Sequence, residues 1–99
     1  MLKKIIKCSA NWCAPCKALE PIYDEAEKKY GSLDFVRINV DNARGEEEKE
    51  FLTKNNVRSI PTLFFLDEEG NILHTEVGYI SSNKFDELVD KLTDENEDK

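Results

Sequence analysis

The residues best suited to chemistry lie in one short stretch, Trp12-Cys13-Ala14-Pro15-Cys16-Lys17. Two thiols separated by two residues can bring both sulfur atoms to the same point in space. This spacing suits either a reversible disulfide or one half of a metal site. Pro15 between the cysteines and the strongly helical run after them favour the redox interpretation.

The start of a predicted helix gives the two cysteines different tasks. Near an N-cap, the Cys13 sulfur lies beside unpaired backbone N–H groups and the positive end of the helix dipole, which stabilise a thiolate. Pro15 suits the first turn because its φ is fixed and it has no N–H to satisfy. Cys16 lies one turn in and points back toward Cys13. We therefore expect the outer cysteine, Cys13, to be the nucleophile and Cys16 to be the shielded resolving thiol.

The chain has 99 residues, enough for one small domain with a modest core. Hydrophobic residues make up 39% and charged residues 35%, as in a soluble globular protein. The formal net charge of −7 argues against a nucleic-acid partner, which would require a basic surface. Most of this charge lies in residues 46–50 and 94–99, which we interpret as solvated faces.

The apolar start of the chain is too short for a signal or membrane segment, and Lys7 interrupts it. We interpret residues 3–10 as a strand, and expect a cytoplasmic protein without a membrane partner. The odd count of three cysteines does not resemble the disulfide framework of a secreted miniprotein.

Hydrophobic periodicity predicts the order β-α-β-α-β-β-α, an α/β domain over residues 1–93 followed by a flexible acidic tail, 94–99. The predicted strands are 3–10, 34–40, 62–66 and 71–77, and the predicted helices are 14–30, 46–55 and a last one capped by Ser81 or Ser82. The apolar positions of these helices are Ala18, Leu19, Ile22, Ala26 and Tyr30 in the first, Phe51 and Leu52 in the second, and Phe85, Leu88, Val89 and Leu92 in the third. The first two strands, joined through a helix, should be parallel, and the last two should form an antiparallel hairpin.

Four features give the chain a close resemblance to the thioredoxin family, and together they span nearly all of it. They are the 12–17 motif, in which Ala14 replaces the usual glycine, Pro21 inside the first helix, Ile60-Pro61-Thr62 and Val77-Gly78. The resemblance implies a thioredoxin-like fold reduced to a minimal four-stranded mixed sheet flanked by three helices. Because only twelve residues precede Cys13, we expect the usual first strand and helix of the family to be missing.

The resemblance implies a thiol–disulfide oxidoreductase that reduces protein disulfides through a reversible Cys13–Cys16 disulfide, with Cys13 as the exposed nucleophile. No bound organic cofactor and no metal are needed. The implied partners are oxidised protein substrates and an electron donor of the thioredoxin-reductase type, and we expect a monomer.

The resemblance also implies a substrate site built from three loops. Backbone groups of Ile60 would pair with an extended target strand, and Pro61, in a cis peptide bond, would hold that loop. The other residues expected to contact the substrate form a flat apolar surface: Trp12, Val77, Gly78 and Tyr79. Ala14 and Pro15, between the cysteines, would tune the redox behaviour.

Lys7 departs from the family pattern, in which an aspartate usually stands six residues before the first active-site cysteine. The family's partner lysine corresponds to Arg37, so an acid–base pair has become two cations. Our preferred interpretation is that Lys7 turns its amine to solvent. In the alternative, Lys7 approaches the site, stabilises the Cys16 thiolate and makes the protein more oxidising.

Other functions stay open at this point. The same fold can work as a disulfide oxidase or isomerase, although Pro15 favours the reducing direction. Three cysteines and His74 form the inventory of a structural zinc site, but we expect Cys8 to be a small buried hydrophobe and His74 a surface residue. A non-catalytic binding module is the third alternative, and the intact thiols, proline and glycine argue against it.

Overall fold

The seven elements of the computed structural model, which describes residues 1–94, follow the predicted order. The strands are β1 (Leu2–Ser9), β2 (Asp34–Asn39), β3 (Thr62–Asp67) and β4 (Ile72–Val77), and the helices are α1 (Ala14–Lys29), α2 (Gly45–Lys54) and α3 (Ser82–Asp94). The predicted acidic tail begins at the last residue of α3, and the rest of it lies outside the described residues.

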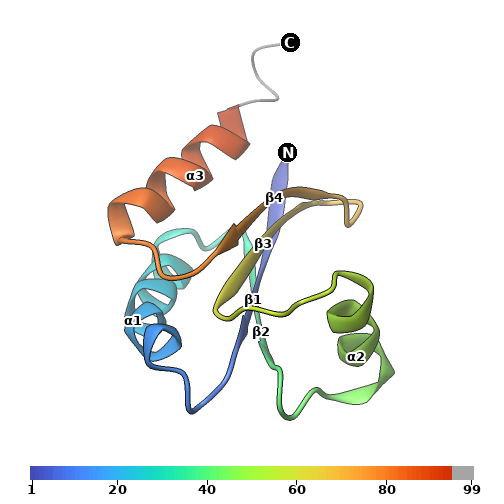
Figure 1. Cartoon of the computed structure of the whole chain (residues 1–99). Helices are drawn as coiled ribbons and strands as arrows, with labels where there is room; N and C mark the ends of the chain where they lie inside the picture. Colours follow the sequence, from blue (N-terminus) through green and yellow to red (C-terminus); the bar gives the residue numbers. More distant parts are fainter. Residues whose placement is uncertain (95–99) are drawn as a thin grey trace.

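The four strands form one mixed sheet in the order β2-β1-β3-β4. β1 pairs in parallel with β2, and β3 pairs antiparallel with both β1 and β4, so both predicted strand pairings are confirmed. Figure 1 shows α1 and α3 on one side of the sheet and α2 on the other. The predicted α/β architecture, a minimal four-stranded mixed sheet flanked by three helices, is therefore confirmed.

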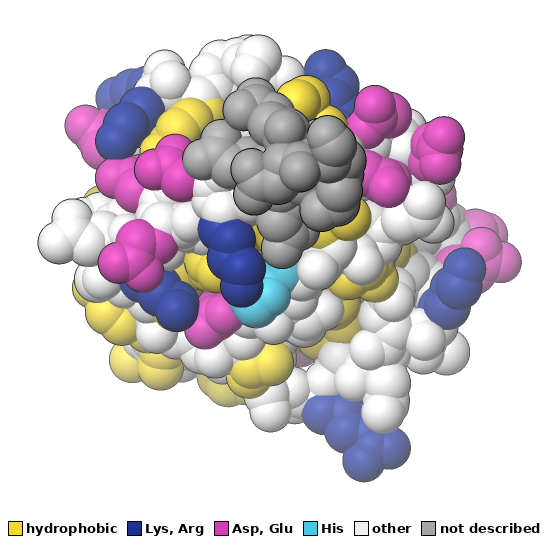
Figure 2. Space-filling model, turned by 90° about the horizontal axis from the view of Figure 1, so that it is seen from above, with side chains coloured by type: hydrophobic (Ala, Val, Ile, Leu, Met, Phe, Trp, Pro, Cys, Tyr) yellow, Lys and Arg dark blue, Asp and Glu magenta, His cyan; other side chains and the backbone are white. Residues whose placement is uncertain are grey.

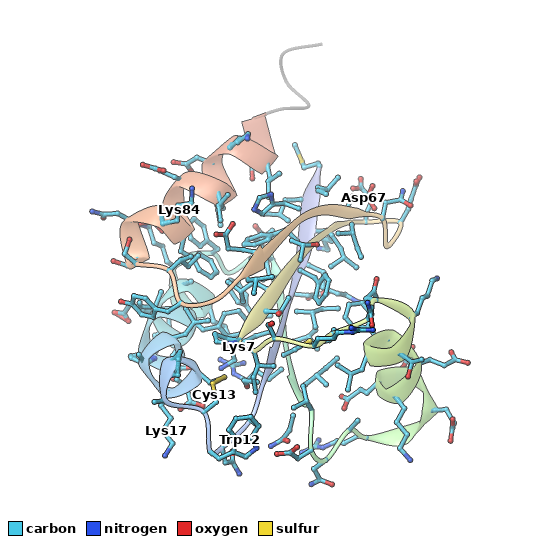
Figure 3. All side chains as sticks on the ribbon, viewed as in Figure 1. Lys7, Trp12, Cys13, Lys17, Asp67 and Lys84 are labelled. Atoms are coloured by element: carbon cyan, nitrogen blue, oxygen red, sulfur yellow. A yellow bond between two sulfur atoms is a disulfide. The ribbon has the colours of Figure 1, made fainter. Side chains whose placement is uncertain are left out.

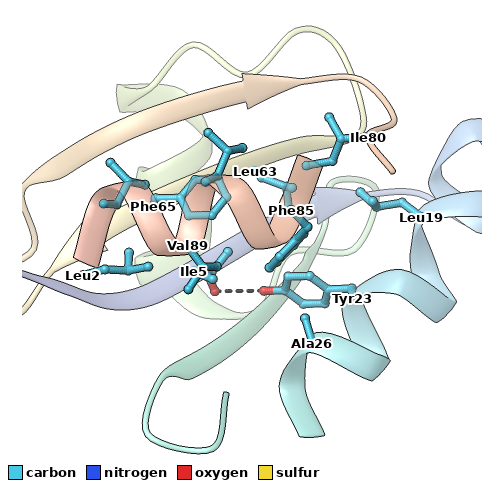
Figure 4. Close-up of a cluster of buried hydrophobic side chains, with 12 residues drawn as sticks. Leu2, Ile5, Leu19, Tyr23, Ala26, Leu63, Phe65, Ile80, Phe85 and Val89 are labelled. Carbon is cyan, nitrogen blue, oxygen red and sulfur yellow. Dashed lines mark hydrogen bonds between the residues drawn. The ribbon is translucent and has the colours of Figure 1, made fainter. Parts of the chain in front are cut away.

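The larger core lies between the sheet and the helices α1 and α3 (Figure 4). Alternate strand residues such as Ile5, Leu63 and Phe65 face this side and are fully buried. The predicted apolar face of α3 is buried along its length: Phe85, Leu88, Val89 and Leu92. The Ser81 hydroxyl accepts a hydrogen bond from the Lys84 N–H at 3.2 Å, so Ser81 caps α3.

Tyr23 belongs to this core, although its helical position was not among those predicted to be apolar. Of the predicted positions, Ala18 is exposed and Ile22 is only partly buried, whereas Tyr23 is fully buried. Its hydroxyl lies 2.9 Å from the Ile5 carbonyl oxygen and 2.8 Å from that of Val36. A phenol has one hydrogen to donate, so the two carbonyls share it and α1 is tied to both β1 and β2.

The opposite face of the sheet carries a smaller core, made by Ile6, Cys8, Ile38, Phe64 and Leu66. Phe51 and Leu52 of α2 pack against it as predicted, although each stays only partly buried. The Phe51 ring meets the Phe64 ring edge-on, with 5.0 Å between centroids. Because strand side chains alternate, Cys8 faces α2 whereas its neighbour Lys7 faces α1.

The surface at the end that carries both termini mixes acidic, basic and hydrophobic side chains (Figure 2). His74, the single histidine of the chain, lies on this face and is partly buried. Within residues 1–94, no helix is long and apolar enough to cross a bilayer.

Candidate active site

Cys13 and Cys16 lie at the N-terminus of α1, where they form a disulfide. Cys13 is the N-cap residue, in extended conformation, and the Cys16 N–H points at its sulfur with 3.2 Å between the two heavy atoms. Pro15 lies in the first turn, as predicted. When the disulfide is reduced, this N–H and the helix dipole both stabilise a thiolate on Cys13.

Neither sulfur of the pair is exposed in the disulfide-bonded form. The exposed fraction is 5% for Cys13 and 3% for Cys16, so the expectation of an exposed Cys13 is wrong for this state. The loop before β3 lies against the disulfide, with 3.8 Å between Cys13 Sγ and the Ile60 carbonyl oxygen, and Ala10 packs beside both cysteines.

The Ile60–Pro61 peptide bond is cis, as the family resemblance implied. The Gly78 N–H donates to the Pro61 carbonyl oxygen at 2.7 Å, and Gly78 has a φ of +96°, a region that favours glycine. This hydrogen bond joins the loop before β3 to the end of β4. The structure thus brings together the predicted segments of Ile60, Pro61 and Gly78, with the Ile60 carbonyl beside the disulfide.

Large exposed hydrophobic side chains lie on the segments that meet here: 69% of Trp12, 59% of Val77 and 51% of Tyr79 are exposed. Ile60 is partly buried. Such a concentration of exposed apolar side chains on one small protein is typical of a docking surface.

Asp41 is a residue of this site that the sequence did not reveal. Its Oδ2 accepts a hydrogen bond of 2.6 Å from the indole Nε1–H of Trp12, which fixes the orientation of the exposed ring. The two residues are 29 positions apart in the chain. The available signal was topological: β1 and β2 are parallel, so the loops that follow them leave the same edge of the sheet.

Lys7 does not turn its amine to solvent, so our preferred interpretation of this residue is wrong. Its exposed fraction is 2%, because β1 is a central strand and α1 covers this face. The ammonium lies 4.0 Å from Glu20 Oε2 and 5.0 Å from the centre of the Tyr23 ring. Burial lowers the pKa of the Lys7 amine, and the Glu20 carboxylate acts in the opposite direction. Figure 3 shows Lys7 at the same end of the sheet as Cys13.

Arg37, the second cation of this region, lies on the edge strand β2 and reaches back over α1. It donates to Asp24 Oδ1 at 2.8 Å and to Glu27 Oε1 at 2.7 Å, and its guanidinium lies 4.9 Å from the centre of the Tyr23 ring. The two carboxylates thus neutralise Arg37.

Cys8 and His74 do not join the cysteine pair. Cys8 is fully buried on the α2 face, and burial raises the pKa of its thiol to about 12, in agreement with the predicted small hydrophobe. His74 lies on β4 and is hydrogen-bonded to Glu76 at 2.8 Å. Within residues 1–94, no three His, Cys, Asp or Glu side chains are grouped so that they could hold a metal ion.

A cysteine pair that switches between disulfide and dithiol, with one sulfur favoured as thiolate by a helix N-terminus, can exchange with the disulfide of another molecule. On this α/β fold, with a cis-proline loop against the sulfurs, such a pair defines a thiol–disulfide oxidoreductase.

Similarity to known proteins identifies the family of thiol–disulfide oxidoreductases to which this chain belongs. The thioredoxin family model matches residues 2–94. The thioredoxin of Bacillus subtilis is 39% identical over 83 residues, which cover 83% of this chain and 74% of that protein. The thioredoxin of Mycoplasmoides gallisepticum is 34% identical over 87 residues, 88% of this chain and 81% of that protein. The chain belongs to the thioredoxin family.

Proposed function

We propose that this protein reduces disulfides of other proteins, with Cys13 as nucleophile and Cys16 as resolving thiol. The observation that carries the proposal is the N-cap position of Cys13, whose sulfur faces the Cys16 N–H at 3.2 Å. That position favours a thiolate on Cys13, and the thiolate is the form that attacks disulfides.

In the first step, the Cys13 thiolate attacks one sulfur of the target disulfide. A bond between Cys13 and the target forms, and the other target sulfur leaves as a thiolate that takes a proton from water. The Cys16 thiolate then attacks Cys13 Sγ, the bond to the target breaks, and the second target sulfur leaves. Two thiols of this protein are oxidised to a disulfide, and the target disulfide is reduced to two thiols.

The target docks on the exposed apolar surface next to the disulfide. An extended segment of the target pairs with backbone groups of Ile60, in the loop that Pro61 and Gly78 hold in place. The support is the short distance between the Ile60 carbonyl and Cys13 Sγ, together with the exposure of Trp12 and Val77.

Turnover requires a source of two electrons that returns the disulfide to the dithiol. We assign this task to a donor of the thioredoxin-reductase type, with oxidised proteins as the substrates. The protein works as a cytoplasmic monomer and uses no bound organic cofactor or metal, because the cysteine pair itself carries the electrons.

The oxidising direction is the second candidate, because a buried cation such as Lys7 favours a thiolate and hence the reduced form. The equilibrium potential of the cysteine pair, measured against glutathione, separates the two. Dithiol proteins range from about −270 mV at the reducing end to about −120 mV at the oxidising end. A potential near about −270 mV supports the reductase, and a potential near about −120 mV contradicts it.

Trapping variants test the assigned roles of the two thiols. We expect Cys16→Ser to accumulate mixed disulfides with target proteins, because nothing remains to attack Cys13 Sγ. Cys13→Ser should accumulate none, because it lacks the nucleophile. Non-reducing gels of each variant after incubation with an oxidised model protein such as insulin give the readout. Equal trapping by both variants would overturn the assignment.

A further inference from the structure

Lys7 is a charged side chain buried beside the helix that carries the cysteines, and the exchange mechanism above does not use it. Its ammonium contacts Glu20 and the ring of Tyr23, both on α1. Burying a charge is costly, so a lysine in this place calls for an explanation.

We propose that Lys7, held by Glu20, is a positioning residue that stabilises the thiolate of Cys16 and thereby sets how fast mixed disulfides resolve. The inference rests on the proposed exchange by Cys13 and Cys16, but not on the direction in which that exchange runs.

The helix geometry places the ammonium against the face of α1 that carries Cys16. Cys16, Glu20 and Tyr23 are spaced four and then three positions apart, so they lie along one face of α1. The Lys7 ammonium contacts the second and third of these residues. The nearer of the two, Glu20, follows Cys16 by about one helical turn, roughly 5.4 Å along the axis.

The charges that face Lys7 leave part of its own charge unneutralised. On α1 these are Glu20 and Asp24, and on β2 the facing charge is Arg37. The Tyr23 ring that the ammonium contacts carries no charge. Asp24 is bound to Arg37, and the neighbour of Lys7 on β3 is Leu63. The remaining counter-charge is the Glu20 carboxylate. Its Oε2 lies 4.0 Å from the Lys7 ammonium, and 62% of the Glu20 side chain is exposed. Its charge is screened by water, while the field of Lys7 acts through the protein interior.

A small cavity of about 260 Å³ gives the proton of Cys16 a way out. Cys16 and Glu20 both line it, together with Ser9, Ala10, Asn11 and Lys17. Three of its lining residues, Asn11, Lys17 and Glu20, are exposed, so water reaches it. The proton that leaves the Cys16 thiol passes to this water.

The same interaction acts in both directions of the exchange. When Cys16 attacks the mixed disulfide, a larger thiolate fraction speeds the formation of the Cys13–Cys16 bond and the breaking of the bond to the target. When a reductant attacks Cys13 Sγ, Cys16 leaves as a thiolate, which a nearby cation also favours. Lys7 therefore stabilises the reduced form relative to the disulfide.

The variant Lys7→Met removes the charge and keeps the length of the side chain, and replacing a buried ion by an apolar group is often tolerated. In a Cys13→Ser background, Cys16 is the one thiol that titrates in the accessible range, because the pKa of Cys8 is raised to about 12. We expect Lys7→Met to raise the pKa of Cys16 by about one unit, equivalent to about tenfold less thiolate at neutral pH. Thiolate absorbance against pH is the measurement.

Two further variants make the test specific. Glu20→Gln removes the counter-charge and should shift the pKa of Cys16 in the opposite direction. Lys3→Met is the matched control: Lys3 lies on the same strand, about 13 Å away along β1, and is exposed, so it should leave the pKa unchanged. With both cysteines present, the glutathione equilibrium of Lys7→Met, measured at a pH above the pKa of Cys16, should move about tenfold toward the disulfide.

The outcomes separate this inference from the proposed function. If Lys7→Met is folded and its Cys16 pKa and glutathione equilibrium match those of Lys3→Met, the role of Lys7 is refuted. If the unmodified protein does not exchange with glutathione at all, the proposed function fails, whereas the Cys16 titration still reports on Lys7.

Discussion

Lys7 and Cys8 are adjacent residues of β1, and the pleat of the strand sends them to opposite sides of the sheet. Lys7 lies on the α1 side with a charged head beside Glu20, and Cys8 lies on the α2 side among apolar side chains. One position along the strand thus decides whether a side chain takes part in the electrostatics of the cysteine pair or only fills a core.

The thiol of Cys8 should be chemically silent in the folded protein. It is fully buried, and burial raises its pKa to about 12, so it stays protonated at neutral pH. We expect a thiol reagent to modify Cys13 of the reduced protein under native conditions and Cys8 only in denaturant. Fast modification of three thiols under native conditions would contradict this assignment.

The raised pKa of Cys8 also predicts a pH dependence of stability. Because the folded state favours the protonated thiol, the contribution of Cys8 to the free energy of unfolding is fully present below the unfolded pKa of about 8.5. It is lost as the pH rises toward about 12, the folded value. Urea unfolding between pH 8 and pH 11 should show a smaller loss of stability in Cys8→Ala, which is itself less stable at neutral pH because it leaves a small cavity.

At the residue scale, the sequence predicted groups whose roles follow from local chemistry. The cysteine pair, Pro15 in the first turn and the burial of Cys8 all depend on spacing along one element. Asp41 and the burial of Lys7 depend on which elements lie side by side. Nothing near Trp12 in the chain indicates its acceptor, and a lysine on a strand can reach solvent unless a helix covers it.

At the scale of elements, the site is assembled where several of them begin or end. The cysteines cap α1 just after β1 ends, Pro61 directly precedes β3, and Gly78 directly follows β4. Periodicity predicted these elements with ends shifted by one residue or less. The bond from Gly78 to Pro61 joins two such ends, so the geometry of the loop beside the disulfide depends on the conformation of one glycine.

A pair of glycine variants tests this dependence. Gly78 has a φ of +96°, where a side chain is strained, whereas Gly31 has no such φ, and an added Cβ has open space at both positions. We expect Gly78→Ala to cost about 1–2 kcal/mol of stability and to slow disulfide reduction by displacing the loop of Pro61. Gly31→Ala should change stability by less than about 1 kcal/mol and leave the rate unaffected. Urea unfolding and insulin reduction measure both effects, and equal behaviour of the two variants would refute the strain argument.

At the scale of the whole molecule, the helix that carries the cysteines is held to the rest of the fold at its middle and at its C-terminal end. In the middle of α1, the Tyr23 hydroxyl bonds to carbonyls of β1 and β2. At its C-terminus, Asp86 of α3 accepts hydrogen bonds from the Tyr30 hydroxyl at 2.7 Å and the Lys29 ammonium at 3.0 Å. This second attachment links segments 56 and 57 residues apart, so no local pattern in the sequence indicates it.

The link between α1 and α3 should make the free energy of unfolding depend on pH in the acidic range. The hydrogen bond from Tyr30, and then that from Lys29, lower the pKa of the Asp86 carboxyl below its ordinary value. The stabilisation is therefore present above the unfolded pKa of about 3.9 and is lost as the pH falls through the lower folded value. Asp86→Asn keeps the shape of the side chain but loses its charge, so its stability should fall less between pH 6 and pH 2 than that of the unmodified protein.

Glu87→Gln, on an exposed position of the same helix, is the control, and urea unfolding at each pH is the measurement. Parallel stability curves for Asp86→Asn and the unmodified protein would show that the carboxylate does not hold the two helices together.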